Sequence, residues 1–494
     1  MRRILPLLLA AAALATAPLS RAQDAVPTLT QDDAIRLALQ HNKNLIVSSF
    51  GKGISRANLL AARGQFEPSL YGNRSGSDTP AQANTGLIGV GLIPLYDYRI
   101  DNYAVGIEGL TPIGTKYQVY ESSENERFSF YGYSSDYMTF GGFQVTQPLL
   151  QGFGFDANLQ QVRIAKANRG ISDWAYRGSA ITTVTNVIVA YSNLLLAHDQ
   201  LDAARRSRDL ATTLLAGNEK KYKVGDISQS DVIAARAYVA LYEEPILIAE
   251  RGVRDSQNSL RELIGEEVFH EDEPLFALVP PAVPDVTVNL KADLAKALEL
   301  RPDYQQARLG IVKDRVMEAA ARNALLPQVN FVGGYGYNGY GSTLSASRQM
   351  VDNHDNPSYS AGLEVTIPLT LATGRGTLRA ARLTREQADE DLRRREADIA
   401  VAVATAAGQI ETTRKRVAVD QIAYDLALKA LDAQEKKRLA GTSTTLEVIQ
   451  QQEAVSSAQS AVATALASQR QAVAVYDQTL GTTLERHDIK LSDD

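Results

Sequence analysis

The chain contains two versions of one nine-residue stretch, Val224-Gly225-Asp226-Ile227-Ser228-Gln229-Ser230-Asp231-Val232 and Ala440-Gly441-Thr442-Ser443-Thr444-Thr445-Leu446-Glu447-Val448. Glycine, an acid and valine keep the same spacing in both versions. Glycine is favoured just after the end of a helix, because it accepts a left-handed conformation without a side-chain clash. Each version therefore predicts the turn of a helical hairpin.

Matches outside these turns show that they belong to a larger repeat. The offset is 259 positions from Ala38–Leu45 to Ala297–Tyr304, and it is the same from Pro68 to Pro327. The offset falls to 220 from Pro148 to Pro368 and to 216 at the two glycine turns. We therefore predict a duplicated helix-strand-helix-helix unit. Its first copy has about 40 extra residues, the difference between 259 and 220, which form either an enlarged external loop or an added hairpin.

Proline-free stretches predict long helices. No proline occurs between Pro148 and Pro245 or after Pro368, and a helix interior excludes proline. Apolar residues at spacings of four and three, such as Ile399, Val403 and Ala406, favour coiled packing. The predicted helices are 31–64, 157–222, 229–264, 291–324, 375–439 and 444–480. Pro245 is expected to kink or break the helix in which it lies.

Two segments, 66–150 and 330–369, have the alternation of strands and are rich in tyrosine. They hold 13 of the 21 tyrosines in about a quarter of the chain. Alternating strands with aromatic bands are typical of outer-membrane barrels, although a soluble tyrosine-rich sheet shows a similar pattern. Two short strand pairs cannot close a barrel alone. A trimer with four strands per chain is therefore the most economical prediction.

The N-terminal 22 residues predict a signal peptide, with Arg2 and Arg3 before an apolar stretch and small residues before Gln23. Beyond residue 22 no apolar run approaches the roughly 20 residues of a spanning helix, so any membrane crossing would be made by strands. The absence of cysteine excludes disulfides, thiolate metal sites and a lipid anchor. The net charge of -6 gives no basic surface for nucleic acid.

The sequence predicts no catalytic site, no metal site and no cofactor. Among the five histidines, only His270 lies beside several acids, and because these are consecutive a solvated linker is favoured over a metal site. His198 lies on an apolar seam and is predicted to be a hydrogen-bonded interior residue. No phosphate-binding loop or nucleophile elbow is present. A protein of this kind would not be an enzyme, and energy for transport would come from a partner.

In their order and duplication, the opening helix from Leu29 to Asn44, the Gln147-Pro148-Leu149-Leu150 segment and the two glycine turns resemble the TolC-like outer-membrane efflux proteins. The resemblance implies a mostly α protein with membrane β structure. It would be a homotrimeric 12-stranded β-barrel in outer-membrane lipid, continuing into a long periplasmic α-helical coiled-coil barrel. The implied function is a passive exit duct of a tripartite efflux or type I secretion system. The implied partners are a periplasmic adaptor and an inner-membrane pump.

The implied division is a first repeat 23–264, a linker 265–290 in the equatorial region, a second repeat 291–481 and a tail 482–494. In the family the two turns form a tip that adaptors contact, and acids beyond the second turn narrow the entrance. By position, the tip residues are Gly225, Asp226, Ile227, Ser228, Gly441, Thr442 and Ser443. The gate positions are Glu447, Gln450 and Asp231. Gln450 stands where an acid is expected, and without the resemblance Glu447 would be interpreted as a solvated acid at a helix start.

Two other classes of function share some of these sequence features. An exported trimeric coiled-coil structural or adhesive surface protein would have similar helical seams. It would not need two matching glycine turns or a duplicated strand segment. A periplasmic enzyme is disfavoured because no catalytic constellation is present.

Overall fold

The computed structural model describes residues 28–81, 96–265 and 277–491. The predicted signal peptide and the acidic cluster around His270 lie outside these residues. The chain divides into two compact units. In the described residues, the hairpin unit comprises 28–37, 190–265, 277–283 and 420–467, and the sheet unit comprises 38–81, 96–189, 284–419 and 468–491.

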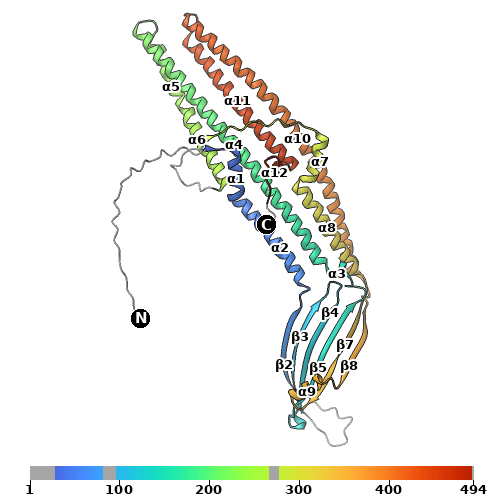
Figure 1. Cartoon of the computed structure of the whole chain (residues 1–494). Helices are drawn as coiled ribbons and strands as arrows, with labels where there is room; N and C mark the ends of the chain where they lie inside the picture. Colours follow the sequence, from blue (N-terminus) through green and yellow to red (C-terminus); the bar gives the residue numbers. More distant parts are fainter. Residues whose placement is uncertain (1–27, 82–95, 266–276, 492–494) are drawn as a thin grey trace, which may run out of the picture. The chain divides into compact units, whose positions relative to one another are not determined.

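Two helical hairpins form the hairpin unit (Figure 1). In the first, the end of α4 (Gln160–Lys223) is followed by α5 (Gln229–Leu241) and α6 (Glu243–Ile264). In the second, the end of α10 (Ala372–Leu439) is followed by α11 (Thr445–Leu480). Helices α4 and α10, 64 and 68 residues long, lie where the sequence predicts the long helices. Within the described residues, α4 alone is long and apolar enough to cross a membrane, but 67% of its apolar window is buried, which is typical of a core helix.

Proline explains the break in the returning part of the first hairpin. The helix is interrupted at Tyr242, and Pro245 lies in the first turn of α6. An amide in the first turn of a helix has no partner within that helix, so proline removes no bond there. The predicted break near Pro245 is confirmed.

Each opening helix is two helices, so the prediction of one continuous helix is wrong in both copies. The first copy has α1 (Gln31–His41) and α2 (Lys43–Gly64), separated by Asn42, whose side chain accepts a hydrogen bond from the Leu45 amide at 3.1 Å. The second copy has α7 (Leu290–Leu300) and α8 (Pro302–Asn323). A capping asparagine and a proline at the first helical position both start new helices.

A buried tyrosine ties the linker to α4 inside the hairpin unit. Strand β1 (Thr28–Leu29) pairs in parallel with β6 (Ala277–Leu278). The Tyr191 hydroxyl donates to the Leu29 carbonyl at 2.8 Å and accepts from the Val279 amide at 3.1 Å. Tyr191 is fully buried. The residues just before the proline-rich segment are therefore held against the middle of α4.

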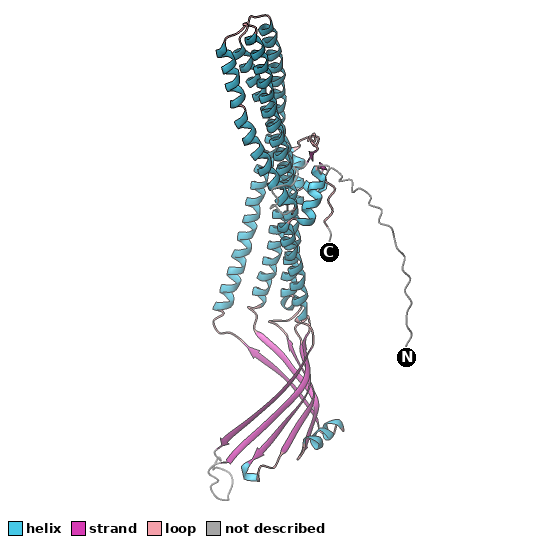
Figure 2. Cartoon of the chain, turned by 90° about the vertical axis from the view of Figure 1, so that its left-hand side faces the viewer, coloured by secondary structure: helices cyan, strands magenta, loops and turns pink. Residues whose placement is uncertain are grey.

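In the part of the chain that the structure describes, the sheet unit contains six strands in one antiparallel sheet (Figures 1 and 2). In spatial order they are β2 (Ser69–Ala81), β3 (Tyr96–Leu110), β4 (Lys116–Phe128), β5 (Asp136–Pro148), β7 (Gln328–Gly341) and β8 (Pro357–Thr366). The prediction of four strands per chain is wrong, and the 12-stranded count for a trimer depended on it. The extra residues of the first copy form an added hairpin, β3–β4, because their backbone groups pair with the neighbouring strands along their whole length.

The two faces of this sheet differ in chemistry. One register row crosses all six strands with large apolar or aromatic side chains and is called the apolar row: Leu70, Ile107, Val119, Phe143, Tyr335 and Tyr359. The adjacent row lies on the opposite face, since successive side chains alternate, and is called the polar row: Ser69, Glu108, Gln118, Gln144, Gly334 and Ser360. The sheet therefore has one apolar and one polar face at this level.

Short helices complete the sheet unit. They are η1 (Ser129–Tyr131), α3 (Phe155–Asn158), α9 (Leu344–Asp352) and α12 (Thr483–Arg486). Helix α9 connects β7 to β8 and packs on β5 and β7, with Ser347 fully buried. The Thr139 and Ser347 hydroxyls are 2.7 Å apart, which fixes α9 on the sheet.

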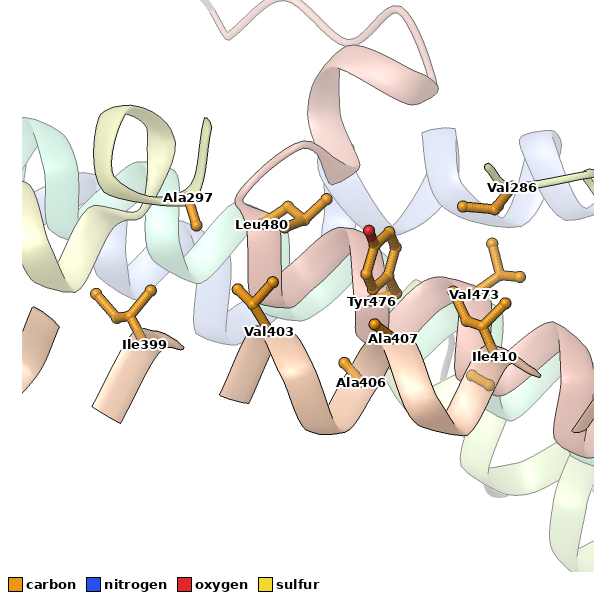
Figure 3. Packing of buried hydrophobic residues seen from close by; sticks show 11 residues of the cluster. Val286, Ala297, Ile399, Val403, Ala406, Ala407, Ile410, Val473, Tyr476 and Leu480 are labelled. Atoms are coloured by element: carbon orange, nitrogen blue, oxygen red, sulfur yellow. The ribbon is translucent and has the colours of Figure 1, made fainter. Parts of the chain in front are cut away.

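The helical core of the sheet unit lies where α10, α11, α7 and the segment before α7 meet (Figure 3). Its buried members are Val286, Ala297, Ile399, Val403, Ala406, Ala407, Ile410, Ala472, Val473, Tyr476 and Leu480. The predicted seam along α10 is thus confirmed as a packed face. The Tyr476 hydroxyl donates to Asp293 Oδ2 at 2.6 Å. Burial, followed by this carboxylate, raises the pKa of Tyr476, so the phenol stays a neutral donor.

Candidate functional site

The two predicted tip turns have the same backbone structure. Gly225 and Gly441 have φ values of +84° and +77°, the left-handed conformation expected of glycine after a helix. The next amide, of Asp226 or Thr442, bonds to a carbonyl five residues earlier at 3.0 Å in both turns. This is the Schellman pattern, which satisfies carbonyls at the end of a helix. Figure 1 shows both turns at the same end of the hairpin unit.

Both returning helices begin with a capping box. Ser228 and Asp231 bond reciprocally through side chain and backbone at the start of α5. At the start of α11, the Thr444 amide donates to Glu447 Oε2 at 2.9 Å, and the Glu447 amide donates to Thr444 Oγ1 at 3.3 Å. The structure thus places both predicted gate acids at the third position of a helix. There they satisfy amides that have no partner within the helix.

Glu447 is held by more contacts than its counterpart Asp231. Its Oε2 also accepts from Ser443 Oγ at 2.8 Å and from Gln434 Nε2 at 3.2 Å. These donors, led by the Thr444 amide, lower the pKa of Glu447 below its usual value of 4.5. The exposed carboxyl group is therefore negative at neutral pH, and its direction is fixed by the turn.

The remaining predicted site residues are mostly exposed. Gln450 lies on the surface one helical turn beyond Glu447, while the neighbouring Val448 and Ile449 are buried. Asp226, Thr442 and Ser228 are exposed, and Ile227 and Ser443 are half-buried. The structure brings Ser443 and Glu447 into direct contact, and Ser228 and Asp231 likewise.

The two hairpins contact each other away from their turns. The Ser207 hydroxyl on α4 donates to Ser456 Oγ on α11 at 3.1 Å, and the Tyr242 hydroxyl donates to Glu453 Oε1 at 3.3 Å. Burial, followed by the Glu453 carboxylate, raises the pKa of Tyr242 to about 12. The sequence interpretation missed these residues. The acidic residue Glu453, three positions after Gln450, is the sequence feature that could have indicated the contact between the hairpins.

Exposed apolar side chains beside the turns were also missed. Val224, directly before the first glycine, is 74% exposed, and Leu439 at the end of α10 is 76% exposed. Basic residues occupy the last turns of both long helices: Lys220, Lys221, Lys223, Lys436, Lys437 and Arg438. Cations at a helix C-terminus are favoured by its dipole. Each turn therefore presents an apolar side chain next to positive charge.

The described residues give no indication of a metal centre. In 28–81, 96–265 and 277–491, no three histidine, aspartate or glutamate side chains gather closely enough to hold an ion. His198 is half-buried on α4, and burial lowers its pKa, which favours the neutral imidazole.

Comparison with known sequences gives one family. The family model described as outer membrane efflux protein matches residues 113–266 and 294–482. The pyoverdine export outer membrane protein OpmQ of Pseudomonas aeruginosa is 25% identical over 312 residues, which cover 60% of each chain. The outer membrane protein TolC of Vibrio cholerae is 22% identical over 205 residues, covering 40% of this chain and 44% of that one. The chain thus spans less than two thirds of the length of these relatives.

Comparison with solved structures gives the same fold over nearly the whole chain. The outer-membrane channel OprN has a TM-score of 0.67 at 16% identity, covering 91% of this chain and 89% of its own. The Campylobacter jejuni CmeC outer membrane channel has a TM-score of 0.65 at 15% identity, covering 94% and 87%. At these identities, the likeness concerns the fold.

Proposed function

This chain belongs to the outer membrane efflux protein family, and from that membership we propose that it is the exit duct of a tripartite efflux or type I secretion system. It is an outer-membrane protein with a large periplasmic helical part. In the proposed assembly, three copies share one membrane barrel and one helical tunnel. Cargo moves passively, because the inner-membrane pump supplies the energy.

The observation that carries this proposal is the division of the sheet into an apolar and a polar face. The hydrocarbon core of a bilayer has no hydrogen-bonding groups, so a membrane-spanning sheet must pair its backbone internally and present apolar side chains outward. The members of the apolar row are 41% to 85% exposed although they are large and apolar. The polar row on the other face suits a water-filled lumen. A soluble coiled-coil or adhesive protein has no need of such a face.

The two turns are the proposed contact for the periplasmic adaptor. Val224 and Leu439 offer exposed apolar anchors, and lysines and arginine flank them. Buried apolar anchors surrounded by charge are typical of protein interfaces. The predicted tip residues, Gly225 to Ser228 and Gly441 to Ser443, form the turns that present these side chains.

The proposed gate consists of Glu447, Gln450 and Asp231 at the starts of the returning helices. Three Glu447 carboxylates around a constriction would disfavour anions and attract cations. The capping contacts support this role, because they hold each carboxylate ionised and in one direction. Gln450 is neutral, so a second carboxylate ring is not part of the proposal.

The test is conductance of the full chain, extracted from outer membrane in mild detergent and reconstituted in planar lipid bilayers. We expect discrete single-channel openings from a trimeric particle. Val119→Asp on the apolar face should reduce membrane insertion, because a charged side chain that faces lipid destabilises a membrane barrel. The matched variant Ser122→Asp, on the polar face of the same strand, should still insert. A soluble monomer that never conducts would contradict the proposed function.

A further inference from the structure

The added hairpin β3–β4 changes how many strands each chain contributes to a barrel shared by several chains. Strand β2 follows Pro68 and β7 follows Pro327, so these strands correspond in the two repeats. In the second repeat β7 pairs directly with β8. In the first repeat, β2 and β5 are separated by β3 and β4. The first repeat therefore contributes four strands and the second contributes two.

The added hairpin is built into the sheet on both sides. Strand β3 pairs with β2 from Tyr96 to Glu108, and β4 pairs with β5 from Lys116 to Glu126. Its turn is also fixed, since the Gly154 amide donates to the Ile113 carbonyl at 3.0 Å. Gly114 in this turn has a φ of +97° and lies against the Gly152 carbonyl, so the turn packs closely on the segment before α3.

The added strands continue both faces of the sheet. Ile107 and Val119 belong to the apolar row, and Glu108 and Gln118 belong to the polar row. An external loop or a plug inside the lumen would be surrounded by water and would need no apolar row. The pattern is that of a membrane-spanning wall.

Among the residues that the structure describes, the two outer strands of the sheet, β2 and β8, lack a partner on one side. The apolar row reflects this, because its terminal members Leu70 and Tyr359 are 77% and 85% exposed, whereas the four inner members are 41% to 56% exposed. Unpaired strand edges do not occur in the lipid core. With six antiparallel strands, β2 and β8 run in opposite directions, so β8 of one copy can pair with β2 of the next in the same antiparallel pattern.

The register also has the stagger that closure requires. The polar row begins at Ser69, the first residue of β2, and reaches β8 at Ser360, six residues before the end of that strand at Thr366. Six residues over five strand-to-strand steps correspond to a strand tilt of about 40°, at about 3.4 Å per residue and about 4.8 Å per step. Strands in closed barrels tilt by roughly 35–45°.

We propose that each copy of this chain contributes all six strands to the membrane wall, so that three copies close an 18-stranded barrel. The inference rests on the proposed trimeric channel and specifies its membrane part. The partner for the free edge of β8 is β2 of a second copy. Since barrel diameter grows roughly linearly with strand number, this barrel is about 1.5 times as wide as one of 12 strands. Barrels of this strand number leave an aqueous channel.

Disulfide crosslinking tests the junction between copies, because the chain has no native cysteine. If successive copies start at the same level, Ser69 of the next copy faces Thr366, and Leu70 lies beside Val365. The double variant Leu70→Cys/Val365→Cys is expected to oxidise to a covalent trimer on a denaturing gel. Ile107→Cys/Val365→Cys, with one cysteine on an inner strand, is the matched control and should stay monomeric.

A second pair tests whether the added hairpin is in the wall. Val119 and Phe143 face each other across β4 and β5, and Phe143 and Tyr335 face each other across β5 and β7. In conducting trimers, both Val119→Cys/Phe143→Cys and Phe143→Cys/Tyr335→Cys should close within one chain and lose their free thiols. The pair Phe143→Cys/Tyr335→Cys serves as the positive control, since β5 and β7 are adjacent whether or not the hairpin belongs to the barrel wall.

The outcomes separate this inference from the proposed function. A covalent trimer with both inner pairs closed supports 18 strands. A covalent ladder that ends at the dimer, or conducting trimers in which only the Phe143→Cys/Tyr335→Cys pair closes, would overturn the 18-stranded barrel while the channel function stands. Protein that neither crosslinks nor conducts would overturn the channel function itself.

Discussion

Glu447 shows how one residue can serve both as a helix cap and as a proposed gate. Its carboxylate accepts from Thr444, Ser443 and Gln434, and these bonds fix it at the start of α11. The pattern Thr444-Thr445-Leu446-Glu447 is the sequence signature of a capping box, as is Ser228-Gln229-Ser230-Asp231. The capping role is local and was therefore predictable from the sequence. A gate ring needs several copies, so local pattern does not determine it.

The lowered pKa of Glu447 predicts a pH dependence for this turn. A carboxyl group whose pKa is depressed by folding stabilises the folded turn fully above its usual value of 4.5, and this contribution is lost as pH falls through the lower folded value. Glu447→Ala should therefore speed amide exchange at the start of α11 at pH 7. The difference from the wild type should disappear in strong acid. Asp231→Ala, measured at the start of α11, is the control and should have no effect there; equal exchange in Glu447→Ala and wild type at pH 7 would contradict the capping role.

Gly441 is predicted to be required by its backbone conformation. A side chain at φ +77° costs about 1 to 2 kcal/mol, so Gly441→Ala should loosen the second turn. Hydrogen exchange of the turn amides should become about 5 to 30 times faster. The matched variant is Gly408→Ala in the interior of α10, where a Cβ would meet nothing within 4 Å. That substitution should stabilise the helix by about 0.5 to 1 kcal/mol, and similar loosening in both variants would argue against this explanation.

At the scale of elements, helices were more predictable than strands. The long helices follow from proline-free stretches and the 3.6-residue period, which are local properties. Strand pairing joins segments far apart in sequence, such as β5 and β7, so the local alternation does not show how many strands exist. For this reason the sequence does not distinguish an added hairpin β3–β4 from an enlarged loop. It also does not predict the breaks at Asn42 and Arg301, because their capping signals lie inside periodic segments.

Helix α9 packs on the sheet through a close contact between Gly339 and the backbone of Ser347, and this contact can be tested by substitution. A Cβ on Gly339 would lie 1.8 Å from the backbone oxygen of Ser347, and backbone cannot move aside easily. Gly339→Ala is therefore expected to displace α9 from β5 and β7. Limited proteolysis should cut α9 faster in this variant. Gly362→Ala on β8, where a Cβ would meet nothing within 4 Å, should be cut at the wild-type rate.

At the scale of the whole molecule, the two faces of the sheet predict the selectivity of the pore. Glu124 and Glu121 both lie on β4, but Glu124 shares the face of the polar row and Glu121 shares that of the apolar row, where it pairs with Arg348. If the polar face lines the lumen, three Glu124 carboxylates attract cations.

Glu124→Gln should therefore lower the preference for cations, measured as the reversal potential across a KCl gradient in planar bilayers. Glu121→Gln removes the same charge from the same strand and should leave the reversal potential unchanged. The face assignment would be wrong if Glu121→Gln shifted the reversal potential and Glu124→Gln did not.

The duplication can be read from the amino-acid sequence alone, because it is a match between two stretches of that sequence. The long helices and the two glycine turns are also predictable, because they depend on contacts between residues close in the chain. Glycine, proline and capping residues act within one helical turn, so their effects can be read without the fold. The number of strands, their register and the separation of apolar and polar faces become clear only in the folded chain. These properties depend on backbone pairing between distant segments, where a shift of one residue moves every side chain to the opposite face.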